Sequence, residues 1–485
     1  FLEALERGDW ILLDEINLAR EESLGILYGL LTKGYIEFKG ERIGVKDRGG
    51  MLFAAGNLSE DEGRELFSEA FENRFQVLYS GRMKKSQQEI ILYDNYKGKI
   101  EGLSDGDIEA MVELNEDMDR DMQNNRFKGF ENERPYPFTI RNIENILENT
   151  MIRISQEKGI TVREALIKEI YIEYRDILHR SKENLVDILE PAIKQHFGND
   201  IEIPKISNKL SKAEDGSIEI DGIRTVGPED REEVDEGKVP KEEDIDLIMT
   251  ESTRDITRAV LYGFRNQRKP VMFLGQTGGG KTYTIENTAK ELGWQYHSEN
   301  MRDTPISSLI GQWERDKKTG IIGFKDGIMI EAMKRGYCLV LEEINFMETG
   351  LIEVISEWID EGYFTNPKTG ERIEVHPDFR LFATLNPQQG VTRLSLGRNV
   401  LPAPFINRFK LVWVEEKGRE EQKEILEGML AKANIDTSFA DEVVELHSKF
   451  QGLVEDNKIG QESPEGYRIG LREIIRVGEF LKEHT

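Results

Sequence analysis

Runs of apolar residues that end in polar side chains recur along the chain. Two of them, Trp10–Leu13 and Cys338–Leu341, each lead into a pair of carboxylates and then into an apolar stripe at helical spacing. A continuous apolar run is typical of a buried parallel strand, and such a stripe is typical of a helix that packs on one. The pattern therefore predicts an α/β fold built on parallel sheets.

The two segments share further features in the same order. Each continues into a Gly-Tyr hairpin pattern, a second apolar run that ends in asparagine, and the sequence Asn-Arg-Phe. In the first segment these three features occupy residues 34–42, 51–57 and 73–75. In the second segment they occupy residues 362–372, 380–386 and 407–409. Matching positions lie roughly 330 residues apart, and a shared order at nearly one offset indicates an internal repeat rather than chance similarity between strand ends.

A glycine-rich segment follows the apolar run Val271–Leu274 and precedes the helix-compatible residues 285–292. It fits the pattern G-x-x-x-x-G-K-[ST] and comprises Gly275, Gln276, Thr277, Gly278, Gly279, Gly280, Lys281 and Thr282. In this pattern backbone N–H groups and a helix N-terminus surround phosphate oxygens, the lysine reaches the β- and γ-phosphates, and the hydroxyl ligates Mg²⁺. We therefore predict a site for a nucleoside triphosphate and Mg²⁺.

Polar side chains at the ends of two apolar runs are the candidates for chemistry at this site. Glu342 can orient the Mg²⁺ shell, and Glu343 can polarise the attacking water. Asn386 ends the neighbouring run and can hold that water beside the γ-phosphate. An isolated carboxylate pair would more simply be a helix N-cap, and an isolated asparagine a turn residue. Their place downstream of the phosphate loop favours catalysis.

Two arginines in the second half of the chain can also reach a phosphate. Arg408 precedes a strand-like run and can serve a nucleotide on a neighbouring module, as arginine fingers do. Arg472 lies on a predicted helix and can project from a lid onto the nucleotide. The alternative for both is a surface arginine in an ion pair.

These residues resemble the AAA+ ATPases, and more narrowly the dynein-related, MoxR-like and midasin-like clade. The resemblance assigns residues 275–282 to Walker A, residues 339–343 to Walker B, Asn386 to sensor 1, Arg408 to the arginine finger and Arg472 to sensor 2. The matching residues of the first segment are Asp14, Glu15, Asn57, Arg74 and Arg141.

This resemblance implies an ATPase that uses Mg²⁺. Thr282 and Glu342 would ligate the metal in the second module, and Asp14 would do so in the first. In AAA+ rings the finger lies on the face opposite its own phosphate loop, so Arg408 is expected to complete the site of the first module. Arg74 would do the same for whichever module precedes it.

Two departures from the family pattern bear on function. Glu342 stands where the family carries aspartate, so its carboxylate extends one methylene further. A phosphate loop for the first module would lie before Phe1, and we therefore expect the chain to be part of a longer protein.

The patterns together divide the chain into tandem AAA+ modules, each a P-loop α/β core with a parallel sheet plus a helical lid. The first module is expected to be truncated at its N-terminus. The expected parts are a partial first core over 1–95, its lid over 96–200, an acidic linker over 201–245, a complete second core over 246–415 and its lid over 416–485. A capping box from Thr161 to Glu164 predicts the start of one helix in the first lid.

Composition narrows the functional classes. The formal net charge of −27 argues against direct nucleic-acid binding. No apolar run approaches the ~20 residues that span a bilayer. Cys338 is the single cysteine of the sequence, which excludes an internal disulfide framework and favours a reducing intracellular location. We expect the cytoplasm, or the nucleus for a eukaryotic midasin-like protein.

Three functions stay open on these grounds. The first, implied by the midasin-like resemblance, is an ATP-hydrolysing motor or chaperone module that remodels a macromolecular assembly such as a ribosome precursor. The second is a MoxR-type chaperone that matures another protein, or inserts metal into it, with a von Willebrand A-type partner. The third is a regulatory module that holds nucleotide without turnover. The expected partners are neighbouring AAA+ modules in a six-membered ring and a protein or ribonucleoprotein substrate.

Overall fold

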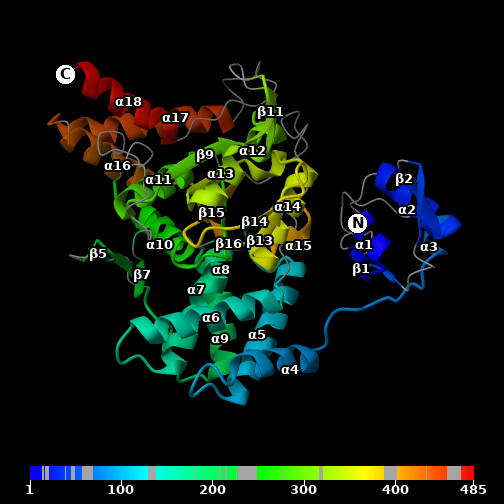
Figure 1. Ribbon diagram of the computed structural model, residues 1–485. Helices are drawn as coiled ribbons and strands as arrows, with labels where there is room; N and C mark the ends of the chain where they lie inside the picture. The colour runs from blue at the N-terminus through cyan, green and yellow to red at the C-terminus, as the bar shows by residue number, and fades with distance from the viewer. Residues whose placement is uncertain are drawn as a thin grey trace. The chain divides into compact units, whose positions relative to one another are not determined.

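The computed structural model contains two compact units (Figure 1). Residues 1–83, with 399–403, form the first unit, and residues 84–398 and 404–485 form the second. The structure describes residues 1–13, 16, 21–38, 40–44, 50–56, 69–128, 138–179, 181–206, 209–213, 216–225, 227, 248–276, 278–315, 320–386, 401–432, 434–455 and 471–484. In these ranges no helix combines the length and the apolar composition needed to cross a membrane.

A parallel sheet of five strands forms the centre of the second unit, as the apolar runs predict. Its strand order is β16-β8-β15-β12-β9, and each neighbouring pair is parallel. The strands are β8 Val271–Leu274, β9 Tyr296–Asn300, β12 Cys338–Glu342, β15 Arg380–Leu385 and β16 Lys410–Trp413. Because all five are parallel, their carboxyl ends lie along one edge, where α/β proteins bind ligands.

Helices and hairpins surround this sheet (Figure 1). The helices are α10 Glu251–Arg265, α11 Lys281–Leu292, α12 Ile306–Ile310, α13 Ile328–Arg335, α14 Thr349–Glu361 and α15 Ala403–Ile406. The hairpins are β10 Gly311–Arg315 with β11 Ile322–Asp326, and β13 Tyr363–Thr365 with β14 Arg372–Glu374. Ile256 and Val260 of α10 and Ile285 of α11 pack with Phe273 and Phe382 of the sheet in one buried cluster.

Three C-terminal helices, in the range predicted to be the lid, form a small core of their own. They are α16 Arg419–Lys432, α17 Ala440–Glu455 and α18 Leu471–His484. Leu426, Leu430, Val444 and Ile474 are buried together among them. The residues after β16 therefore begin a second packing centre. The interpretation of these helices as a lid stays a prediction.

A helical region precedes the sheet in the chain. It contains α4 Lys85–Tyr96, α5 Asp105–Gln123, α6 Ile140–Gln156, α7 Val162–Ile177, α8 Lys182–Asn184, a π-helical turn Leu185–Leu189 and α9 Glu190–Phe197. Thr161 caps α7 by accepting the N–H of Glu164, so the predicted capping box is present.

Buried charges join this helical region to the sheet. The Lys410 ammonium of β16 lies 2.9 Å from a Glu173 carboxylate oxygen and 3.3 Å from an Asp176 carboxylate oxygen, both on α7. Arg258 of α10 also pairs with Asp176. Burial alone would lower the pKa of Lys410, but the two carboxylates raise it overall. Removing one partner of a buried pair typically costs about 3–5 kcal/mol, so these contacts hold the region firmly on the core.

The predicted acidic linker over 201–245 contains ordered structure. Strands β5 Leu210–Lys212, β6 Ile218–Ile220 and β7 Ile223–Thr225 form an antiparallel sheet. Ile218, Ile220 and Ile223 are buried in the same cluster as α10. The strands are only three residues long, too short for their alternation to emerge from a polar stretch. Residues 207–208, 214–215, 226 and 228–245 of the predicted linker lie outside the described residues.

The first unit shows the order of elements that follows β12 in the second. It contains α1 Leu2–Arg7, β1 Ile11–Leu13, α2 Glu21–Lys33, β2 Tyr35–Phe38, β3 Glu41–Gly44, β4 Leu52–Ala54 and α3 Glu69–Glu72. Strands β1 and β4 are parallel, as β12 and β15 are, and a helix and a hairpin lie between them in both cases. The interpretation of this unit as part of another AAA+ module stays a prediction.

The strands of the first unit are less buried than their apolar runs predict. Leu12 of β1 is 67% exposed and Phe53 of β4 is 43% exposed. A two-stranded sheet covered by α2 on one face leaves its other face open to solvent, which explains this difference.

Candidate functional site

The glycine-rich segment forms a tight loop between β8 and α11. The backbone N–H of Gly275 donates to the carbonyl of Leu385 at 3.1 Å, which fixes the loop against β15. A Cβ atom on Gly275 would lie 2.1 Å from the Val414 carbonyl oxygen, so only glycine fits there. Gly280, with φ 85°, precedes the first residue of α11. The loop therefore directs backbone N–H groups and a helix N-terminus toward one place, as phosphate binding requires.

Lys281 connects this loop to the end of β15. Its ammonium donates to the carbonyls of Gly275 and Gln276, each at 2.6 Å, and lies 3.4 Å from Asn386 Oδ1. The residue is only 7% exposed. The amide of Asn386 in turn donates to Glu343 Oε1 at 3.5 Å. The structure thus brings together three residues predicted from separate segments.

The two carboxylates that end β12 have different partners. Glu342 Oε1 accepts a hydrogen bond from Ser298 Oγ of β9 at 2.7 Å. Glu343 has a left-handed backbone with φ 52°, which is uncommon outside glycine and typical of strained functional positions. The different environments fit the different roles predicted for them, with Glu342 fixed against the sheet and Glu343 turned toward Asn386.

An arginine that the sequence patterns do not single out also contacts Glu343. The guanidinium of Arg302 donates to Glu343 Oε2 at 3.2 Å and 3.3 Å, and it lies 4.5 Å from the ring centroid of Phe346. Arg302 follows the carboxyl end of β9. Its position after a strand of the sheet is the only feature of the sequence that could have indicated a role at the site. The ion pair holds the carboxylate that is predicted to polarise water.

The residues present fit ATP and Mg²⁺. The glycine cradle admits no side chain at Gly275, the Lys281 ammonium lies within the loop, and Thr282 is half-buried in the first turn of α11. Thr282 and Glu342 would hold Mg²⁺ together with phosphate oxygens, in keeping with the preference of this ion for few protein ligands. When bound, the metal would neutralise charge that develops on the phosphates.

A substitution can test how the length of the Glu342 side chain affects ATP turnover. Glu342→Asp should maintain or raise the turnover of ATP, because it restores the shorter carboxylate of the family pattern. The Ser298 hydroxyl then loses a partner at a half-buried position, which limits the cost to about 1 kcal/mol. Phosphate release measured over a Mg²⁺ titration checks this, and loss of turnover at saturating Mg²⁺ would contradict it.

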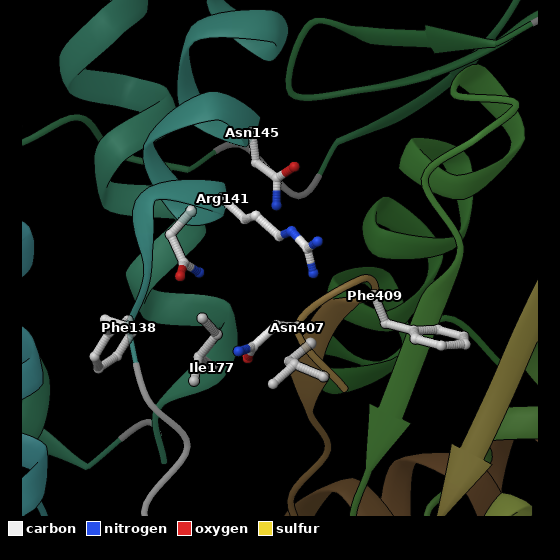
Figure 2. A pocket seen from close by; sticks show the side chains of 8 residues that line it. Phe138, Arg141, Asn145, Ile177, Asn407 and Phe409 are labelled. Carbon is white, nitrogen blue, oxygen red and sulfur yellow. The ribbon is translucent and has the colours of Figure 1, made fainter. Parts of the chain in front are cut away.

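Arg408 and Arg141 meet at one carbonyl although the two are 267 positions apart in the numbering. Arg408 Nη1 donates to the Pro404 carbonyl at 2.8 Å, and Arg141 Nη1 donates to the same oxygen at 3.3 Å. Arg141 extends from α6 toward the segment that carries Asn407 (Figure 2). Burial first, and the charge of Arg408 second, lower the pKa of Arg141. Two cations that share one acceptor form a place suited to an anion.

Arg408 also has the ion pair that its alternative interpretation predicts. Its guanidinium lies 2.5 Å from Asp360 Oδ2 of α14, and its side chain is 13% exposed. In the first unit Arg74 contacts α2 in a comparable way. It donates to Thr32 Oγ1 and Tyr28 Oη, both at 2.9 Å. Each Asn-Arg-Phe arginine therefore contacts the helix that follows the carboxylate pair of its own segment.

Several predicted site residues cannot be placed. Those outside the described residues are Asp14, Glu15, Asn57 and Thr277. Arg472 lies in the first turn of α18, and its side chain is not among those described. The roles of these residues stay predictions.

Comparison with known proteins agrees with this geometry. Residues 270–409 match the AAA domain (dynein-related subfamily). The chain is 27% identical over 87% of its length to midasin of Dictyostelium discoideum and 25% identical over 88% to midasin of Giardia intestinalis, and it spans 7% and 9% of those proteins. An uncharacterized protein of Staphylococcus haemolyticus is 25% identical over 44% of the chain, which spans 79% of that protein. Residues 270–409 therefore match an AAA domain of the dynein-related subfamily, and the chain is similar to midasins over most of its length.

Proposed function

We propose that the chain binds Mg-ATP at residues 275–282 and hydrolyses it. The observation that carries this proposal is the convergence of Lys281, Asn386 and Glu343 at the carboxyl ends of neighbouring parallel strands. Lys281 would neutralise the β- and γ-phosphates, and Asn386 would orient a water. Glu343 would accept the proton of that water as it attacks the γ-phosphate. The Arg302 contact holds this carboxylate in place until the nucleotide site is assembled.

The Arg141 and Arg408 pair supports a second, shared nucleotide site. The resemblance to AAA+ ATPases assigns both arginines to the nucleotide of the first module, and they donate to one carbonyl oxygen. A phosphate there would displace Asp360 from Arg408 and offset the repulsion between the two cations. We infer that the chain acts within a ring of AAA+ modules, in which each finger completes a neighbour's site.

The work done by this hydrolysis is proposed to be remodelling of a macromolecular assembly. ATP would alter the angle between the core and the lid, and a ring would convert that change into force on a protein or ribonucleoprotein. The relatives named midasin favour a midasin-like role such as remodelling of ribosome precursors. A MoxR-type role, with a von Willebrand A-type partner, would use the same chemistry.

One observation favours a regulatory module that holds nucleotide without turnover. Glu343 is paired with Arg302, so one of its carboxylate oxygens faces a guanidinium rather than an attacking water. If the Glu343–Arg302 ion pair persists when ATP is bound, the site would bind ATP without hydrolysing it. A steady-state ATPase assay on the full chain separates the two functions.

Replacing Lys281 tests the nucleotide site itself. Lys281→Ala should weaken ATP binding by at least about a hundredfold, because it removes the cation at the β- and γ-phosphates. Lys290→Ala is the matched control, since Lys290 lies in the last turn of the same helix. Calorimetric titration of both variants with Mg-ATP measures the effect. Equal affinities in Lys281→Ala and wild type would refute the assignment of the loop.

A further inference from the structure

A buried lysine lies where the chain passes from the core to the lid. Lys417 is 6% exposed and belongs to the segment between β16 and α16. Its ammonium donates to Ser252 Oγ at 2.5 Å and to Thr253 Oγ1 at 3.1 Å, and it lies 3.5 Å from Thr250 Oγ1. Thr250 is the N-cap of α10, and the other two hydroxyls lie in its first turn. Lys417 therefore fastens the beginning of the lid to the first helix of the core.

Two more hydrogen bonds strengthen this joint. Glu421, in the first turn of α16, accepts the backbone N–H of Ser252 at 2.8 Å. The side-chain amide of Gln422 donates to the backbone carbonyl of Lys417, also at 2.8 Å. The first turn of the lid, the lysine and the start of α10 are thus one hydrogen-bonded group.

The same segment runs along the phosphate loop. The N–H of Val414 donates to the carbonyl of Leu274 at 2.7 Å. A Cβ atom on Gly279 would lie 3.1 Å from Val414 Cγ1, and one on Gly280 would lie 3.8 Å from Lys417 Cε. The hydrogen bond from Val414 to Leu274 and the narrow space beside Gly279 place the segment that carries Lys417 directly against the loop, so a shift of the loop should displace this segment.

The surroundings of Lys417 disfavour its charged ammonium, so an anion bound nearby would stabilise it. Among the described residues, no carboxylate oxygen lies within 4.0 Å of its ammonium. Burial has the largest effect and lowers the pKa of Lys417, while Glu421 and Glu424 of α16 oppose it. Around it, α10 presents hydroxyls and the loop before α11 presents Gly280. The N-terminal ends of both helices carry positive partial charge, which disfavours a cation.

We propose that Lys417 is a nucleotide-responsive clamp between the core and the lid. The polyphosphate bound by the loop stabilises the charged ammonium, and the charged ammonium in turn holds the lid on α10. This inference rests on the proposed nucleotide site at residues 275–282. Lys417 is a positioning residue, because it acts on the lid rather than on the reacting atoms. It provides a physical route by which nucleotide binding fixes the angle between core and lid.

The test measures ADP binding to the full chain in wild type, Lys417→Arg, Lys417→Met and Lys423→Met. Lys423 is the control because it lies on α16 with its ammonium paired to Asp441 at 2.6 Å. Calorimetry in buffers of different ionisation enthalpy gives the protons taken up per ADP between about pH 8 and 9.5, where ADP phosphates are already ionised.

Wild type and Lys423→Met should take up protons when ADP binds, and their ADP affinity should fall as pH rises, because the anion raises the pKa of Lys417. Lys417→Arg stays charged, so it should bind without this uptake and with little pH dependence. Lys417→Met should bind ADP about tenfold more weakly near pH 7.

Each other outcome has a defined meaning. If Lys417→Arg takes up as many protons as wild type, or if wild type takes up none, the clamp is refuted, because a purely structural lysine would not titrate with binding. Should Lys417→Met fail to fold, wild type and Lys417→Arg still decide the matter. If wild type binds no ADP at all, the proposed nucleotide site fails instead.

Discussion

Glu343→Gln is expected to retain ATP binding and to lose turnover by at least about a hundredfold. Glutamine keeps the shape of the side chain and can still accept the hydrogen bond from Asn386. It cannot accept a proton from water, and it also ends the ion pair with Arg302. The expected result is therefore a protein that traps ATP. Calorimetry measures the binding, and phosphate release measures the turnover.

Glu348→Gln is the matched control for this substitution. Glu348 is an exposed carboxylate five residues further along the chain. The Glu348→Gln variant should hydrolyse ATP at the wild-type rate. Wild-type turnover in Glu343→Gln would mean that another group accepts the proton.

The second large effect concerns the arginines of the two Asn-Arg-Phe sequences. The site at Lys281 would need a finger from a following module, and in the proposed assembly of copies the first unit of the next copy would supply Arg74. An isolated chain should therefore bind ATP but hydrolyse it slowly. An arginine finger contributes about 10³–10⁵ in rate, so turnover per chain should rise steeply once copies associate.

Changing both arginines tests this account. Arg74→Ala/Arg408→Ala should abolish the rise in turnover with protein concentration while ATP affinity is retained, and Arg74→Ala alone shows which finger serves the Lys281 site. Arg335→Ala is the control, because Arg335 is an exposed arginine whose side chain lies near Glu331 of its own helix. A concentration-dependent rise that survives in the double variant would remove the main argument for a ring.

The sequence predicts the core of the second unit because each signal there is local. Strand β8, the loop and helix α11 follow one another within about 20 residues, and the apolar runs of β12 and β15 need no tertiary information. The convergence of Asn386 with Glu343 also follows, because parallel strands end at one edge of a sheet. The positions of these residues in the fold can therefore be predicted from hydrophobic periodicity and sequence motifs alone.

Other features depend on contacts between distant segments and leave no local pattern. Arg302 is an ordinary polar residue until the fold brings it to Glu343. Lys417 lies in the charged run after β16, which suggests a solvated surface, yet α10 buries it. The meeting of Arg141 with Arg408 requires α6 to reach the segment before β16, a tertiary contact that no periodicity encodes.

Phosphate release from Mg-ATP by the full chain, measured over a series of protein concentrations beside Glu343→Gln, tests the central claim most directly. The account predicts turnover in wild type that depends on Mg²⁺, increases per chain as the concentration rises, and is nearly absent in Glu343→Gln at every concentration. Wild-type phosphate release no greater than that of Glu343→Gln across the whole series would contradict hydrolysis at this site.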